Sequence, residues 1–205
     1  MKKSQKEQLI NYLYTFKSFG YKYNESVDLN NLNSSIQDEK SLDMIEHCML
    51  CQGSKMTQNR VLENGNKESP LVIISNLIIK ETQEIELLKK MINNVLFLNF
   101  ESIYMLNIVK CDLNKKDLKN EYIAECKPYI YKQLEMCNKN AHFIFIGESY
   151  KHILNSKNVI QSGTIIDFFN QKALILPELD HILKNPSIKN VVFDGLKRIK
   201  VFMEQ

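Results

Sequence analysis

Apolar runs and amphipathic stretches alternate along most of the chain. Continuous apolar, β-branched runs are typical of buried parallel strands, and they occur at 71–75, 103–109 and 141–146. Two further β-rich runs flank Asn170 and Gln171, at 164–169 and 172–176. Between these runs, apolar residues recur at helical spacing over 81–95, 118–137 and 187–203. This alternation of strands and helices predicts a parallel sheet with helices on both faces.

The N-terminal part differs in composition from the rest. Residues 5–19 predict an amphipathic helix, and residues 23–40, rich in Asn, Ser and Asp, predict a loop. Ser41 suits the N-cap of a short helix that runs to the first cysteine. We therefore expect an N-terminal helix and polar loop over 1–40, followed by one α/β domain over 41–205.

The ends of the predicted strands are the expected place for a ligand. In parallel α/β sheets, ligands bind beyond the carboxyl ends of the strands. Here those ends fall near 75–76, 107–110, 147–148 and 177–181. Pro128 lies inside the helix predicted over 118–137 and should kink or divide it, because proline cannot donate the helical hydrogen bond.

Composition excludes several classes of protein. The 205 residues carry a net charge of +3, which permits contact with a polyanion without demanding it. The longest apolar runs are too short to span a membrane, and the first residues do not form a secretory signal. Only six glycines occur, and none forms a dinucleotide-binding or P-loop motif. A G-x-S-x-G elbow for acyl transfer is also missing.

Cysteine spacing gives the strongest chemical signal. Cys48 and Cys51 form a C-x-x-C motif, and Cys111 and Cys126 lie at the edges of predicted elements. Four thiolates can bind an iron–sulfur cluster or a zinc ion, and the wide second pair favours the cluster. Unremarkable buried cysteines are the alternative. Cys137, on the apolar stripe of a helix, is expected to be a core residue.

Several segments resemble the family 4 uracil-DNA glycosylases, the iron–sulfur branch of that superfamily. The C-M-L-C segment at 48–51, with the approach to the first strand up to 76, is similar to the family's C-x-x-C segment and first-strand motif. Y-M-L-N-I-V-K-C-D-L-N at 104–114 and E-C-K-P-Y at 125–129 resemble Y-x-T-N-x-V-K-C-R-P-P-N and E-x-x-x-C-x-P-Y-L. L-K-N-P-S-I-K at 183–189 is similar to the family's L-L-R-N-P-x-x-K.

The resemblance implies a fold, a cofactor and a partner. The implied fold is a three-layer α/β/α sandwich over a central four-stranded parallel sheet. The implied cofactor is a structural [4Fe-4S] cluster on Cys48, Cys51, Cys111 and Cys126. The implied partner is DNA that contains uracil or another deaminated base. We expect a cytoplasmic monomer with no membrane attachment.

The family's chemistry is retained only in part. Such enzymes flip the damaged nucleotide, stabilise an oxocarbenium-like transition state and donate hydrogen bonds to the departing uracil anion. Asn107 matches the asparagine that reads uracil. Asn76 stands where the family has a catalytic carboxylate, and the base-stacking phenylalanine has no counterpart. Asp180 or His181 replaces the late His-Pro motif, although a surface charged pair accounts for them equally well.

Three functions therefore compete. The first is a glycosylase that removes a deaminated base by a weakened or altered mechanism, with Lys110 and Lys184 on opposite rims contacting the DNA backbone. The second is an inactive family member that serves as an iron–sulfur module for binding DNA or protein. The third is a zinc-stabilised protein with no role in nucleic-acid chemistry. A merely solvated basic face is the alternative reading of the lysines.

Overall fold

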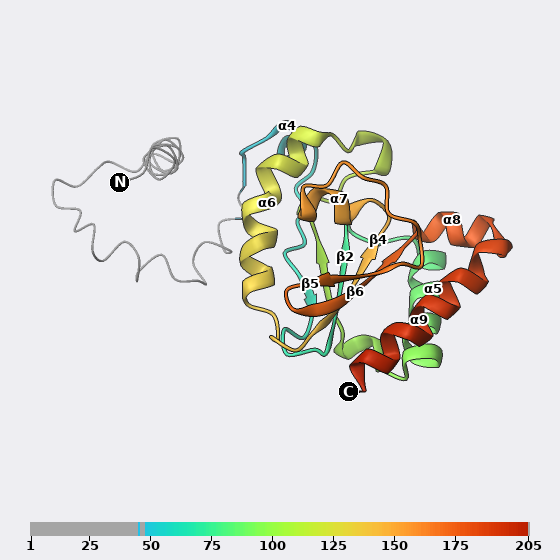
Figure 1. Ribbon diagram of the computed structural model, residues 1–205. Helices are drawn as coiled ribbons and strands as arrows, with labels where there is room; N and C mark the ends of the chain where they lie inside the picture. Colours follow the sequence, from blue (N-terminus) through green and yellow to red (C-terminus); the bar gives the residue numbers. More distant parts are fainter. Residues whose placement is uncertain (1–44, 46–47, 205) are drawn as a thin grey trace, which may run out of the picture. The chain divides into compact units, whose positions relative to one another are not determined.

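The computed structural model describes Ile45 and residues 48–204 (Figure 1). The described α-helices are α4 Gln52–Met56, α5 Thr82–Met91, α6 Asn120–Glu135, α7 Ser149–Leu154, α8 Leu179–Lys184 and α9 Lys189–Met203. The described strands are β1 Asn64–Gly65, β2 Leu71–Ser75, β3 Tyr104–Asn107, β4 His142–Ile146, β5 Ile165–Phe168 and β6 Gln171–Leu176. The helix predicted over 5–19 and the N-cap at Ser41 lie outside the described residues, so the division of the chain at residue 40 stays a prediction.

All six described strands form one sheet in the order β1-β3-β2-β4-β6-β5. The strands β3, β2, β4 and β6 are parallel, whereas β1 pairs antiparallel with β3, and β5 pairs antiparallel with β6. The α/β class and a parallel core of four strands are confirmed. The expected strand count is wrong, because two antiparallel edge strands extend the sheet to six.

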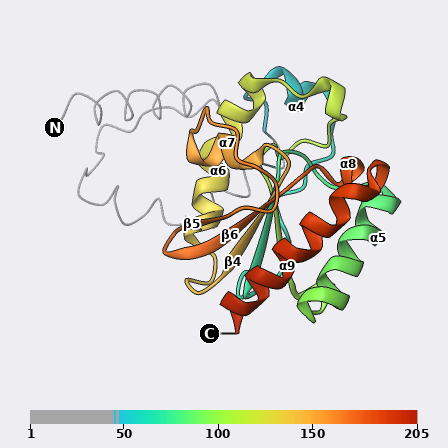
Figure 2. The same ribbon diagram turned by 45° about the vertical axis from the view of Figure 1, so that its right-hand side comes forward.

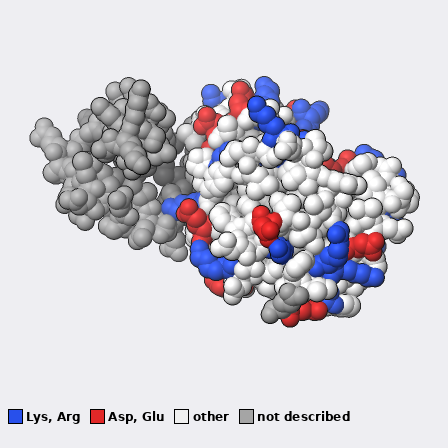
Figure 3. Space-filling model, viewed as in Figure 1, with Lys and Arg blue, Asp and Glu red and all other residues white. Residues whose placement is uncertain are grey.

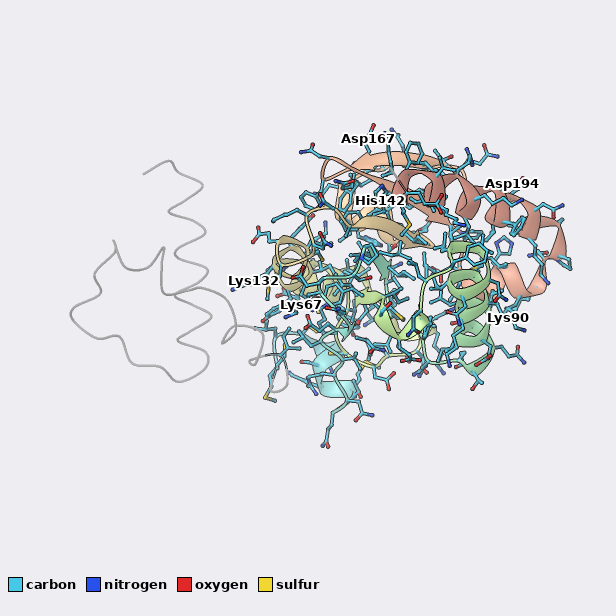
Figure 4. The ribbon with its side chains drawn as sticks, turned by 90° about the horizontal axis from the view of Figure 1, so that it is seen from below. Lys67, Lys90, Lys132, His142, Asp167 and Asp194 are labelled. Carbon is cyan, nitrogen blue, oxygen red and sulfur yellow. The ribbon has the colours of Figure 1, made fainter. Side chains whose placement is uncertain are left out.

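Helices cover both faces of the sheet, as Figures 1 and 2 show from two sides. Val72 and Ile74 pack with residues of α6 and α7 in one hydrophobic core, whereas Leu71 and Ile73 pack with α5, α8 and α9 in a second core. Figure 4 shows the same layers from below, with Lys132 of α6 on one side and Lys90 of α5 on the other. Since β2 is buried on both faces, its sequence is a continuous apolar run.

The predicted helices agree with the structure except near their ends. α5 continues as a π-helix over Ile92–Leu96, and short 3-10 turns occur at Phe100–Ser102, Lys115–Asp117 and Pro186–Ile188. α6 runs through Pro128 without being divided. None of the described helices is both long and apolar enough to cross a bilayer.

The chain order of the strands creates a switch point beside β2. The chain leaves β2 for β3 on one side and later returns to β4 on the other. At such a point the connections after the two strands diverge and leave a crevice, which is where α/β proteins bind ligands. Asn76, which follows β2, and Gly147, which follows β4, therefore border the crevice in which a ligand is expected.

Candidate functional site

The four predicted ligand cysteines line a single cavity. Cys48 and Cys51 precede α4, Cys111 follows β3, and Cys126 lies in the first half of α6. The cavity contains about 310 Å³ of space outside protein atoms, part of it open to solvent. The other residues around it are Ile45, Leu50, Arg60, Lys110, Glu125 and Tyr129. Segments distant in sequence thus bring sulfur atoms to one place.

Arg60 connects the two halves of this cavity. Its main chain pairs with Cys111 in an antiparallel bridge, which is extended by a 2.9 Å hydrogen bond from the Val61 N–H to the Lys110 carbonyl. Its guanidinium donates to the carbonyls of Cys48 at 3.0 Å and Ser54 at 2.7 Å. The buried Nε of Arg60 has no hydrogen-bond partner among the described residues. A buried cationic donor beside four sulfur atoms suits an anionic group in the cavity.

Electrostatics in the cavity disfavour free thiolates. Burial, together with mutual repulsion among the cysteines, raises the pKa of Cys48, Cys111 and Cys126, that of Cys111 to about 11. Main-chain hydrogen bonds from Leu50 to Cys48 and from Lys110 to Cys126 act in the opposite direction. A metal group would have to displace these thiol protons on binding.

The donor set fits a sulfur-ligated metal group better than a mixed site. All four candidate ligands around the cavity are cysteines, and soft thiolates select zinc, copper(I) or iron–sulfur clusters. Within the described part of the chain, no three His, Cys, Asp or Glu side chains are arranged to hold a single metal ion.

Lys110 has a structural position rather than the expected DNA contact. Its side chain is only 2% exposed, and its ammonium donates to the Asn107 carbonyl and to Oε1 of Gln133 on α6. Burial lowers the pKa of Lys110 to about 7. This burial contradicts the prediction that Lys110 contacts DNA. Lys110 instead fixes the loop that carries Cys111 against α6.

Gln133 extends this buried network to the first edge strand. Its Nε2 donates to the Leu62 carbonyl at 2.8 Å and to Glu63 at 3.2 Å. Glu63 also accepts a hydrogen bond from the hydroxyl of Tyr104 and pairs with Lys67 at 3.1 Å. Burial alone would raise the pKa of Glu63, but the hydrogen bonds from these partners lower it overall. The segment that contains Arg60 is thereby held to the sheet.

Asn76 and Asn107 lie where adjacent parallel strands end. Asn76 directly follows β2, and its buried Oδ1 has no hydrogen-bond partner among the described residues. Asn107 ends β3, is 5% exposed, and donates from Nδ2 to the carbonyls of Val109 at 2.6 Å and Val61 at 3.3 Å. Both amide protons of Asn107 therefore serve the protein, whereas the buried Oδ1 of Asn76 has no partner among the described residues.

A cluster of charges surrounds Lys115 beside these strand ends. The ammonium of Lys115 pairs with Glu84 at 2.8 Å, with Asp180 at 3.4 Å and with Glu178 at 3.9 Å. Burial raises the pKa of Glu178, Lys115 opposes this shift, and repulsion by the nearby carboxylates, including Glu148, adds to it. One ammonium thus faces three carboxylates, and the local charge is negative.

The two residues predicted to replace the late His-Pro motif lie on α8. Asp180 pairs with Lys115 and, at 3.3 Å, with Lys184. Burial opposes ionisation of Asp180, but its hydrogen bonds with Lys184 and Lys115 lower its pKa. His181 and Lys184 are exposed. Asp180 is therefore part of the charged cluster, and the roles of Asp180, His181 and Lys184 in catalysis or DNA binding stay predictions.

Sequence reasoning missed Glu178 and the pairing of Lys115. Glu178 lies two residues after the last parallel strand, so its position at a strand end was visible in the sequence. Its charged surroundings were not visible, because they depend on Glu84 from α5 and on Lys115 from the loop after Cys111. Glu178 and these two residues come from three separate segments of the chain.

Comparisons with known proteins agree with the sequence motifs. No family model matches the chain. The chain is similar to the type-4 uracil-DNA glycosylase of Saccharolobus solfataricus, with 24% identity over 77% of this chain and 82% of that protein. It is also similar to the type-4 uracil-DNA glycosylase of Sulfurisphaera tokodaii, with 23% identity over 56% of this chain and 57% of that protein. The resemblance to family 4 uracil-DNA glycosylases is thereby confirmed.

The network around Glu63 predicts a specific acid sensitivity. The pKa of Glu63 lies below its ordinary value of 4.5 in the folded protein, so the unfolded state binds a proton first as the pH falls. The contribution of Glu63 to stability is present above that ordinary value and is lost as the pH falls through the folded-state pKa. In urea unfolding, Glu63→Gln should lose less free energy of unfolding than the wild type as the pH falls from about 6 to about 3, because this range extends below the ordinary pKa of the carboxyl group.

A matched control separates this effect from general acid denaturation. Glu135→Gln makes the same chemical change at an exposed position at the end of α6. This variant should keep the pH dependence of the wild type. Equal pH dependence in the wild type and Glu63→Gln would contradict the role of the network.

Proposed function

We propose that this protein hydrolyses the N-glycosidic bond of a flipped deaminated base, uracil, in DNA. We also propose that Cys48, Cys51, Cys111 and Cys126 hold a [4Fe-4S] cluster. One observation carries the proposal: four cysteines predicted to be ligands line one cavity, in a chain similar to type-4 uracil-DNA glycosylases. The α/β fold with polar residues at the carboxyl ends of its parallel strands supports it further.

The spacing of the cysteines in the sequence favours a cluster over a single ion. A cluster distributes its four cysteine ligands over separate iron atoms, whereas structural zinc needs all four at one centre. Structural zinc sites often use two short C-x-x-C pairs, whereas Cys111 and Cys126 are widely separated in this chain. When bound, a cluster supplies a cross-link between the segment before α4, the loop after β3 and α6. Arg60 offsets the negative charge of the four thiolates.

Hydrolysis requires an oriented water and support for the leaving base. The bond between C1′ and the base breaks with its electron pair leaving on the uracil ring, and water supplies the hydroxyl group to C1′. Asn76 can accept a hydrogen bond from that water, because its Oδ1 is buried without a partner among the described residues. The carboxamide oxygen of Asn107 can accept from the pyrimidine N–H, since its amide protons are already used.

DNA contact has to come from exposed lysines. Lys116 and Lys119 are exposed in the loop that follows Cys111, and Lys184 is exposed on α8. Figure 3 shows basic and acidic side chains interspersed on one face, with no continuous basic stripe visible there. Backbone contacts of this kind are salt-sensitive, so affinity for DNA should fall as ionic strength rises.

A second function is favoured by the substitutions at the strand ends. Asn76 cannot act as a base. Asn107 donates both amide protons to main-chain carbonyls, so it has none left to donate to a base. An inactive family member that binds DNA or protein through a cluster-bearing fold is consistent with both facts. Salt-sensitive DNA binding without release of any base would identify this second function.

The cluster assignment predicts a selective loss of iron. Anaerobically purified protein should contain iron and sulfide in equal amounts and show visible charge-transfer absorbance. Cys111→Ser and Cys126→Ser should lose most of both, because each removes one ligand. Cys137→Ser is the matched control, since Cys137 is also buried but donates its thiol to the Gln133 carbonyl at 3.3 Å.

Two results would contradict the assignment of the cluster. Stoichiometric zinc without iron in anaerobic preparations would replace the cluster by a zinc site. Equal iron content in Cys111→Ser and Cys137→Ser would remove Cys111 from the ligand set.

Base release is the direct test of the proposed activity. The protein should slowly release the base from single-stranded oligonucleotides that contain one uracil. Alkali then cleaves the strand at each abasic site, so the amount of cleaved strand measures base release. Asn76→Ala and Asn107→Ala should each lower the single-turnover rate by about 10-fold or more, because they remove the acceptors for water and base. Asn190→Ala, an exposed change in the first turn of α9, should leave the rate unchanged.

The substrate range and the negative outcome are part of the same experiment. Oligonucleotides with hypoxanthine or xanthine in place of uracil define which deaminated base is preferred. No release from any of them at stoichiometric protein would contradict a glycosylase, and retained DNA binding would then favour the inactive module.

A further inference from the structure

Glu178 sits against the chain at the switch point of the sheet. It directly follows β6 and Pro177, and β6 pairs with β4, which pairs with β2. Its carboxylate packs on the main chain of Gly147, the residue after β4: a Cβ on Gly147 would lie 1.8 Å from Oε1 of Glu178. Gly147 also has φ of +62°, so a side chain there would be strained in any case.

The register of the strands places Gly147 beside Asn76. Ile74 pairs with Phe145 in the parallel ladder between β2 and β4, and each of these strands continues to its carboxyl end in the same direction. Two residues further along, Asn76 follows β2 and Gly147 follows β4. The unpartnered Oδ1 of Asn76 and the carboxylate of Glu178 therefore belong to the same edge of the sheet, with Gly147 between them.

The Glu178 side chain has no structural task that explains its position. Glu178 is the N-cap residue of α8, yet its side chain makes no capping hydrogen bond. Its closest ionic partner, Lys115, is 3.9 Å away and lies nearer to Glu84 and Asp180. The side chain remains 42% exposed. A half-exposed carboxylate without a strong partner is available to a ligand.

Charge around Glu178 makes it a better base than an ordinary glutamate. Lys115 lies closer to Glu84 and Asp180 than to Glu178. The negative charges of Glu84, Asp180 and Glu148 repel the charge on Glu178. Burial and this repulsion raise the pKa of Glu178 despite Lys115. Catalytic bases work best when their pKa approaches the working pH, so the shift has the direction that a general base requires.

We propose that Glu178 is the catalytic carboxylate of this protein and replaces the one that the resemblance implies at Asn76. This inference rests on the proposed glycosylase activity. Glu178 accepts a proton from the water that Asn76 orients, while the oxygen of that water bonds to C1′. The bond from C1′ to the base breaks, and its electron pair leaves on uracil. The proton then passes from Glu178 to solvent or to the uracil anion.

The negative cluster also suits the charge that develops on the sugar. The transition state of glycosidic hydrolysis carries positive charge near C1′. Three carboxylates around one ammonium leave this edge of the sheet with an excess of negative charge to stabilise that cation. The same charge would repel a phosphate, so the cluster fits the sugar cation better than the DNA backbone.

Single-turnover kinetics of Glu178→Gln test the assignment. Glutamine keeps the shape of the side chain and removes its ability to accept a proton. With protein in excess over a uracil-containing single-stranded oligonucleotide, the rate of base release should fall about 100-fold or more. Affinity for the same oligonucleotide without uracil, measured by fluorescence anisotropy, should stay within about twofold, because Glu178 is not a phosphate ligand.

Glu204→Gln is the matched control. Glu204 lies at the end of α9, is 64% exposed, pairs with Lys200 and does not contribute to the charge around Glu178. Its replacement should leave both the rate and the affinity unchanged. Thermal unfolding of both variants checks the fold, and Glu178→Asp, which keeps the carboxylate on a shorter side chain, should retain more activity than Glu178→Gln.

The outcomes separate this inference from the proposed function. Base release at the wild-type rate in both Glu178→Gln and Glu204→Gln would overturn the role of Glu178 and leave the glycosylase intact. No base release by the wild type would overturn both. A loss of activity in Glu178→Gln that came with a lowered melting temperature and was not relieved in Glu178→Asp would assign Glu178 to folding and overturn the inference.

Discussion

The pairing of Arg60 with Cys111 is the contact on which the cysteine cavity depends. Through its main chain, Arg60 adds the segment before β1 to the loop after β3. Through its guanidinium, it holds the carbonyls of Cys48 and Ser54. One residue therefore fixes the C-x-x-C segment relative to a cysteine far along the chain.

The parts of the fold that depend on local pattern could be predicted from the sequence. β2 and β4 are buried on both faces, and such strands leave a continuous apolar run that is visible without a structure. The first edge strand, β1, was not predicted. β1 has only two exposed residues, Asn64 and Gly65, and carries no hydrophobic signal.

The last hairpin escaped prediction because of its turn. β5 and β6 are joined by Phe169 and Asn170, which both have positive φ. A two-residue turn of this kind is usually marked by glycine or asparagine at both positions, and a phenylalanine there hides it. The two runs were recognised as β-rich, but their antiparallel pairing was not expected.

Site residues that are marked by local sequence could be predicted, whereas those defined by contacts with distant segments could not. The four cysteines were recognisable from spacing and context, and they share one cavity. Lys110 was misread as a DNA contact because its neighbour in sequence is a predicted ligand. Its burial depends on Gln133 from α6, a partner that no local pattern reveals. A charged residue beside a functional motif is therefore poor evidence for a surface role until its long-range partners are known.

Parallel strands let a catalytic group change place without changing the fold. The carboxyl ends of β2, β4 and β6 lie at one edge of the sheet, so a carboxylate lost after β2 can be replaced by one after β6. Such a replacement requires that no side chain after β4 blocks the space between β2 and β6. Gly147 leaves this space open, because a Cβ there would collide with the carboxylate of Glu178. Under the proposed mechanism, Asn76 and Glu178 are complementary: the first would supply an acceptor that orients water, and the second would supply the negative charge that asparagine lacks. The divergence of the motif after β2 would then be a redistribution of chemistry along one edge, not its removal.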